Sequence, residues 1–172
     1  MLKRLLGALF VALLTVGCAH AADLKVLTVD YSRAIQEIDE GKAAQSRLDR
    51  MYEGKKAEIE QLEADIMALQ KEYESKVAVL SDAARQEYEQ RLYEKQVLYQ
   101  QTYANADMQM QQAYFSSMEQ LMGGLKNVAE EIGRERGVDL VLEVSQGAVL
   151  YAKPELDITN DVVKRYNAKS SN

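Results

Sequence analysis

Apolar residues recur at alternating spacings of three and four through the middle of the chain, beginning at Leu48. This heptad spacing is typical of a coiled-coil seam, and Lys55 and Lys76 stand at the seam positions that break it. Asp30 or Ser32 can cap the start of this helix, whereas Gly41 and Gly54 weaken its first half. The residues that follow the seam pattern are Leu48, Tyr52, Ile59, Leu62, Ile66, Leu69, Tyr73 and Leu80.

The second half of the chain carries a different repeat, of 11 residues, which indicates a nearly straight helix with about 3.67 residues per turn. Ser81 or Asp82 can cap this helix, so the chain is expected to reverse near residue 81 and run as a helix to Arg136. At about 1.5 Å per residue such a helix is roughly 80 Å long, which predicts a projecting antiparallel hairpin. The repeat comprises Tyr88, Tyr99, Met110, Leu121 and Ile132, with Leu92, Tyr103, Tyr114 and Leu125 four positions after the first four.

Strand signals lie only near the two ends of the sequence, at residues 24–29, 138–144 and 148–151. In the second of these Val138, Leu140, Leu142 and Val144 line one face, and Gly137 suits the end of the preceding helix. A last helix follows Pro154, capped by Asp157 or Thr159, with an apolar side made of Ile158, Val162, Val163 and Tyr166.

These patterns predict a mainly α, α+β chain in three parts. Residues 1–21 form a signal peptide, residues 22–45 and 125–172 form a small β-containing oligomerisation body, and residues 46–124 form a helical-hairpin arm. Three short strands and one helix leave sheet edges open, and oligomerisation is the simplest way to cover them.

The N-terminus has a charged start at Lys3 and Arg4, then a short apolar run, then the small-x-small sequence that ends at Ala21. These three features are typical of a secretory signal peptide, which we expect to be cut between Ala21 and Ala22. Thr15–Cys18 also resembles a bacterial lipobox, so a lipid anchor on Cys18 is the alternative. The apolar run is shorter than the roughly 20 residues that a permanent spanning helix needs.

Cleavage after Ala21 removes the only Cys and the only His, and the remaining 151 residues carry 19 basic and 27 acidic residues, a net charge of −8. We therefore expect no catalytic residue, no cofactor and no metal site, because thiol, imidazole and the usual zinc ligands are absent. The acidic balance argues against a nucleic-acid partner and makes contact with anionic membrane surfaces doubtful.

Met51, Met67, Tyr93 and Met108 lie on the arm but off both repeats, so they are the candidate binding residues. Met is adaptable and Tyr joins an apolar ring to a polar end, which suits promiscuous binding. The tyrosines on the repeats are expected to fill the seam. Gly123–Gly124 interrupts the second helix where the arm meets the body, as a site of close helix packing or as a hinge.

The order of strand, helical hairpin, DLVLEV, GAVLYA and LDITNDVVKRYN resembles the Skp (OmpH) family of periplasmic chaperones, best between Gly137 and Tyr166. The resemblance implies a homotrimer whose strands form a β-barrel body, with three arms around a cavity. It also implies an ATP-independent holdase for unfolded outer-membrane proteins in the periplasm. The best-known members are basic, so their lipid contacts are not expected here. The alternative is a structural or tethering envelope protein, and an enzyme is not expected.

Overall fold

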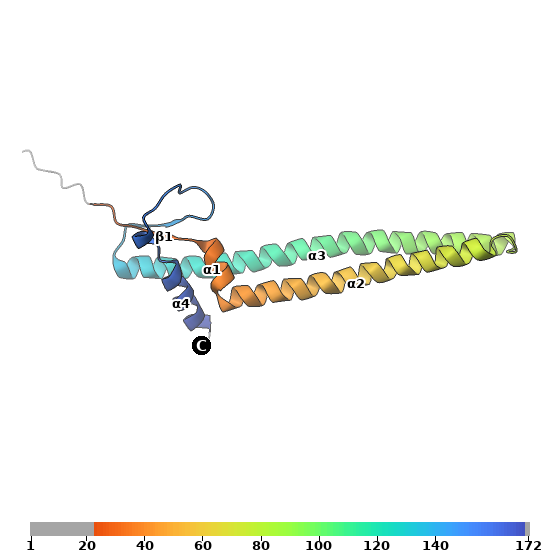
Figure 1. Cartoon of the computed structure of the whole chain (residues 1–172), viewed down its shortest axis with the longest axis horizontal. Helices are drawn as coiled ribbons and strands as arrows, with labels where there is room; N and C mark the ends of the chain where they lie inside the picture. The colour runs from red at the N-terminus through yellow and green to blue at the C-terminus, as the bar shows by residue number, and fades with distance from the viewer. Residues whose placement is uncertain (1–22, 171–172) are drawn as a thin grey trace, which may run out of the picture.

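The computed structural model describes residues 23–170, which form a long helical hairpin attached at one end to a small body (Figure 1). The predicted hairpin arm is therefore confirmed. The expected signal peptide, its cleavage pair Ala21–Ala22 and the alternative lipidation site Cys18 lie outside the described residues.

The N-terminal half comprises strand β1 (Val26–Val29), helix α1 (Tyr31–Glu37) and helix α2 (Asp39–Lys76). Asp30 caps α1, because its carboxylate accepts a hydrogen bond of 2.8 Å from the Arg33 N–H. The chain then turns at the buried Ile38, whose ψ of 146° is extended.

Gly41 lies in the first turn of α2, where a Cβ atom would come within 1.8 Å of the Ile35 carbonyl oxygen. This glycine was expected to weaken a helix, but its function in the fold is to let α2 pass close to α1. The second expected weak point, Gly54, lies inside the unbroken α2.

Helix α3 (Asp82–Arg136) returns along α2 and is the longest element of the chain. Ser81 caps it by accepting a hydrogen bond from the Ala84 N–H, and Gly137 ends it with a φ of +60°. The expected interruption at Gly123–Gly124 is wrong: α3 continues through both glycines, because a helix tolerates a glycine at about 1 kcal/mol when neighbouring turns pack against a core.

The sheet contains two parallel strands, β1 and β2 (Leu140–Glu143), with Val26 opposite Leu140 and Val29 opposite Glu143. The strand expected at residues 148–151 is wrong for this single chain, since these residues form a loop. The Glu143 carboxylate explains the difference: it accepts hydrogen bonds from the backbone N–H groups of Ser145 and Gln146, which holds the chain after β2 in a turn.

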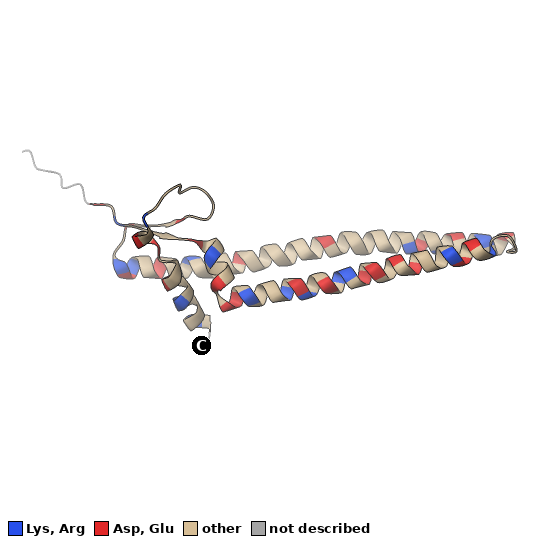
Figure 2. Cartoon of the chain, viewed as in Figure 1, with Lys and Arg blue, Asp and Glu red and all other residues tan. Residues whose placement is uncertain are grey.

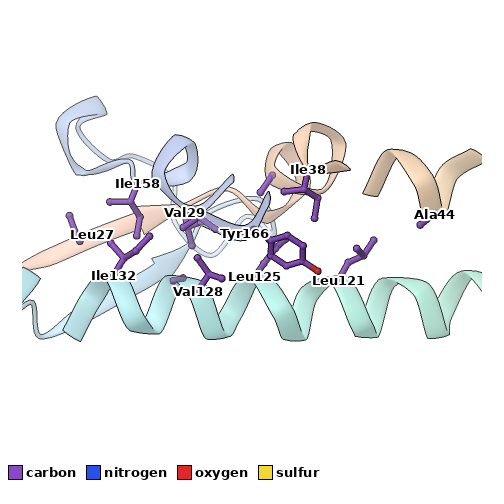
Figure 3. Close-up of a cluster of buried hydrophobic side chains, with 13 residues drawn as sticks. Leu27, Val29, Ile38, Ala44, Leu121, Leu125, Val128, Ile132, Ile158 and Tyr166 are labelled. Carbon is purple, nitrogen blue, oxygen red and sulfur yellow. The ribbon is translucent and has the colours of Figure 1, made fainter. Parts of the chain in front are cut away.

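A short 3₁₀ helix, η1 (Pro154–Leu156), leads into helix α4 (Thr159–Ser170), whose predicted apolar side is confirmed. Its residues pack on the C-terminal third of α3 and on β1 to make the core of the body (Figure 3). We call the part of the chain that packs around this core the body: residues up to Ala44 and from Leu121 onward. The rest of the α2–α3 hairpin, residues 45–120, is the arm. The core consists of Leu27, Val29, Ala34, Ile38, Ala44, Leu121, Leu125, Val128, Ala129, Ile132, Ile158, Val162 and Tyr166.

Candidate functional site

The four candidate binding residues differ in how far they reach into solvent. Met67, Tyr93 and Met108 are exposed, with 71%, 67% and 60% of their surface accessible. Met51 is half-buried. In the single chain, three of the four side chains are thus accessible to a binding partner.

Tyr52, Tyr103 and Tyr114 were expected to fill the seam, but each is more than half exposed. The repeat does not decide which of its members are buried, because Leu125, the next residue in the row of Tyr103 and Tyr114, is completely buried in the body. In the arm, small or aliphatic residues such as Ala106 and Leu69 are buried in the seam instead of Tyr103 and Tyr114.

Two of the exposed tyrosines lie together across the hairpin. Tyr52 of α2 and Tyr103 of α3 line the same open groove of about 420 Å³, together with Ile59 and Met110. Farther along α3, the rings of Tyr114 and Phe115 meet edge to face with centroids 5.9 Å apart. The arm thus presents exposed aromatic and methionine side chains at several points along its length.

A second group of tyrosines is structural, since each donates a hydrogen bond to a carboxylate of the opposite helix. The hydroxyl of Tyr73 reaches Glu89 at 2.9 Å, and that of Tyr99 reaches Glu63 at 2.7 Å. These bonds raise the pKa of both phenols. By contrast, within residues 23–170 the hydroxyls of the exposed Tyr52, Tyr93, Tyr103 and Tyr114 make no hydrogen bond and are open to a partner.

Charge is distributed unequally between the two helices of the arm (Figure 2). Helix α2 carries 17 charged residues among its 38, whereas Asp107 is the only one in residues 96–118 of α3. We call residues 96–118 the uncharged segment. It is a signal that the sequence contained and that the heptad and 11-residue patterns did not reveal.

The base of the arm is held by a contact between three helices. Gly124 lies against the ring of Tyr166, where a Cβ atom would come within 2.6 Å of Cε2, while the matching position at Gly123 is open. The Tyr166 hydroxyl donates a 2.6 Å hydrogen bond to Glu40, which also accepts one of 2.8 Å from Gln120. Burial and then this bond raise the pKa of Tyr166. Close packing therefore accounts for Gly124, and a hinge remains a prediction.

Neither a metal nor a membrane-spanning site is visible in the part of the chain that the structure describes. It contains no group of three or more His, Cys, Asp or Glu residues placed to hold a metal ion. Among the same residues, no helix is both long enough and apolar enough to cross a bilayer. The exposed apolar side chains of the arm form the candidate functional site.

The fold defines the chain as a long helical hairpin attached to a small body, and comparison with known proteins identifies its family. Residues 25–166 match the family model described as outer membrane protein (OmpH-like). The chain belongs to this OmpH-like family, whose members include chaperones of the Skp type.

Two curated relatives and one solved structure are similar over most of the chain. The chaperone protein Skp of Yersinia enterocolitica is 20% identical over 95% of this chain and 99% of its own. A Skp-like protein of Pseudomonas aeruginosa is 27% identical over 85% of this chain and 86% of its own. The crystal structure of an OmpH-like outer membrane chaperone candidate from Caulobacter crescentus shares the fold, with a TM-score of 0.77, 19% identity and 85% coverage of both chains.

Proposed function

We propose that this protein is an ATP-independent periplasmic holdase that binds unfolded outer-membrane β-barrel proteins between its arms and prevents their aggregation. The observation that carries the proposal is the number of exposed aromatic and methionine side chains on an arm that has little core of its own. Many weak apolar contacts along a long surface retain a flexible client without requiring one sequence motif. The charged residues of α2 keep such a surface soluble.

We propose further that the holdase is a homotrimer joined through the body. Leu140 and Leu142 of β2 point away from the core of the single chain, and Leu150 and Tyr151 in the following loop are 97% and 80% exposed. A two-stranded sheet with open edges and exposed apolar residues is a surface that other copies can cover. Replacing Leu150 and Tyr151 with Ser is expected to dissociate the oligomer, as measured by light scattering coupled to size-exclusion chromatography.

The decisive test is to dilute a urea-unfolded outer-membrane β-barrel protein into buffer with increasing amounts of the mature chain and no nucleotide. Light scattering should fall and saturate near three chains per client. No suppression by a folded chain would contradict the holdase proposal and favour the alternative role as a tether. Mass spectrometry of the mature N-terminus separates a start at Ala22 from a lipidated Cys18.

The candidate residues are tested in the same assay by replacing Met67, Tyr93 and Met108 with Ser. We expect weaker holding with an intact oligomer, because all three side chains are exposed and none belongs to the core. Met51 is expected to contribute less than these three, since it is half-buried. Unchanged client affinity in the triple variant would remove the assignment of these residues.

A further inference from the structure

The uncharged segment of α3 differs from the rest of the arm in three ways. Its 23 positions include five large exposed hydrophobic residues, whereas the whole of α2 has two, Tyr52 and Met67. One charged residue interrupts it. The five exposed residues are Leu98, Tyr103, Met108, Tyr114 and Phe115.

The carboxamide side chains of the segment are also unusual. All three glutamines of α2, Gln45, Gln61 and Gln70, donate hydrogen bonds to an acidic residue four positions ahead. Of the seven carboxamides in the uncharged segment, only Gln111 donates a side-chain hydrogen bond within the described chain, to Asp107. The other six are exposed, and none of them donates a side-chain hydrogen bond to another residue within 23–170: Gln96, Gln100, Gln101, Asn105, Gln109 and Gln112.

We infer that this uncharged segment is the main surface that holds one extended, strand-like stretch of an unfolded outer-membrane client, and that α2 contributes mainly solubility, its exposed Tyr52 and Met67 adding fewer contacts. The inference rests on the proposed holdase function and assigns it mainly to one helix of the arm.

Three physical arguments favour an extended chain over a second helix. An extended segment has unpaired backbone N–H and C=O groups, and free carboxamides both donate and accept hydrogen bonds. A helix satisfies its own backbone and would leave these side chains unused. Coiled-coil partners also rely on flanking charges to fix their register, and the uncharged segment lacks them.

The dimensions agree with a transmembrane β-strand. At about 1.5 Å per residue the 23 residues span roughly 34 Å. A transmembrane strand of about 9–11 residues, at about 3.3 Å per residue, covers nearly the same length. Such a strand alternates apolar and polar side chains with few charges, which complements a surface of Tyr, Met, Phe and Gln.

The test compares the double variant M108K/F115K with the control A57K/A64K. Each adds two lysines seven residues apart at exposed helical positions, the first in the uncharged segment and the second on α2. Circular dichroism and size-exclusion chromatography establish that both variants retain the helices and the oligomer. The Kd for a fluorescently labelled, unfolded β-barrel protein is then measured.

We expect M108K/F115K to bind roughly tenfold more weakly or worse, because lost apolar contact and an introduced charge act together. The Kd of the control variant should remain within about twofold of the wild-type Kd, a difference too small to indicate loss of a contact. Equal effects of the two variants, with normal binding by the wild type, would overturn the inference but leave the holdase proposal intact. Absence of binding by the wild type would instead reject the holdase proposal and the inference together.

A photo-crosslinking amino acid at position 108 or 115, compared with position 57 or 64, locates the contact. Crosslinks from the first pair should map to membrane-spanning strands of the client. Crosslinks from positions 108 and 115 to a second copy of this chain, unchanged when client is added, would identify an oligomer contact and overturn the inference.

Discussion

The body and the arm bury apolar residues to very different extents. The body has a connected core of thirteen buried side chains, contributed by β1, α1, α2, α3, α4 and the connecting residues Ile38 and Ile158. In the arm, over the residues that the structure describes, only Leu48, Leu69 and Ala106 are buried hydrophobic residues. The body is stabilised by packing, whereas the arm relies on helix formation and one narrow seam.

This difference explains how one chain combines a fixed attachment with an adaptable surface. A helical hairpin without a third neighbour must leave much of its circumference exposed, and here part of that circumference is apolar rather than charged. A compact domain could not display so much apolar surface at the same chain length. The thin seam of the arm is therefore suited to binding, and the body carries the stability.

The largest effect is expected on the free energy of unfolding, when a substitution creates a cavity in the core of the body. Leu125→Ala removes a completely buried side chain and should lower the free energy of unfolding by about 3 kcal/mol or more. Leu69→Ala in the arm should cost less than about 2 kcal/mol, because the seam is open to solvent and can relax.

Urea unfolding followed by circular dichroism measures the first change. Hydrogen exchange should show that Leu69→Ala speeds the exchange of backbone amides mainly in the arm, while the amides of β1 and α4 remain as protected as in the wild type. Equal, global destabilisation by both substitutions would show that arm and body are a single cooperative unit.

A smaller effect is expected where the arm meets the body. Gly124→Ala places a Cβ atom against the ring of Tyr166, which is anchored to Glu40, so we expect a net loss of about 1–2 kcal/mol after the gain in helix propensity. Gly123→Ala meets no atom within 4 Å and should be neutral or stabilising by up to about 1 kcal/mol.

Thermal unfolding of the two alanine variants measures the difference. Client holding by the Gly123→Ala variant separately tests the hinge, because stiffening this helix should impair a hinge and leave a packed joint unaffected. Normal holding by this variant would argue against a hinge at Gly123.

The smallest expected effect is the loss of folding stability at acidic pH when Glu143 becomes protonated. Burial tends to raise the pKa of Glu143, but hydrogen bonds from Ser145, Gln146 and Tyr31 outweigh it and hold this pKa below its ordinary value. The carboxylate therefore stabilises the fold above its unfolded pKa of about 4.3, and this contribution is lost as the pH falls through the folded pKa.

Glu143→Gln removes that pH dependence. The urea midpoints of wild type and variant should differ most near neutral pH and converge near pH 3. A difference that is constant with pH would mean that the turn after β2 does not depend on the charge of Glu143.

Local patterns in the sequence were sufficient to predict α3, α4 and their ends, but not the break that divides the first expected helix into α1 and α2. The capping of α3 by Ser81, its end at Gly137 and the apolar side of α4 follow from neighbouring residues, since capping and helical periodicity act within one or two turns. The alternating stretches near the termini similarly indicated β1 and β2, although both strands are shorter than the patterns suggested.

Contacts between distant residues decided the remainder. The chain breaks at Ile38 because α1 and α2 pack across Gly41, and Gly124 lies in an unbroken helix because Tyr166, 42 positions later, rests against it. Residues 148–151 have the composition of a strand but no partner strand in the single chain, while Glu143 holds the preceding turn.

The exposed surface of the arm was determined partly by the local sequence and partly by the tertiary structure. The sequence by itself determined that residues 96–118 are helical and almost without charge. Only the tertiary structure decided that Tyr103 and Tyr114 face solvent while Tyr73 and Tyr99 bind carboxylates across the seam. A helical repeat fixes the angle of each side chain around its own axis, but burial depends on where the neighbouring helix lies.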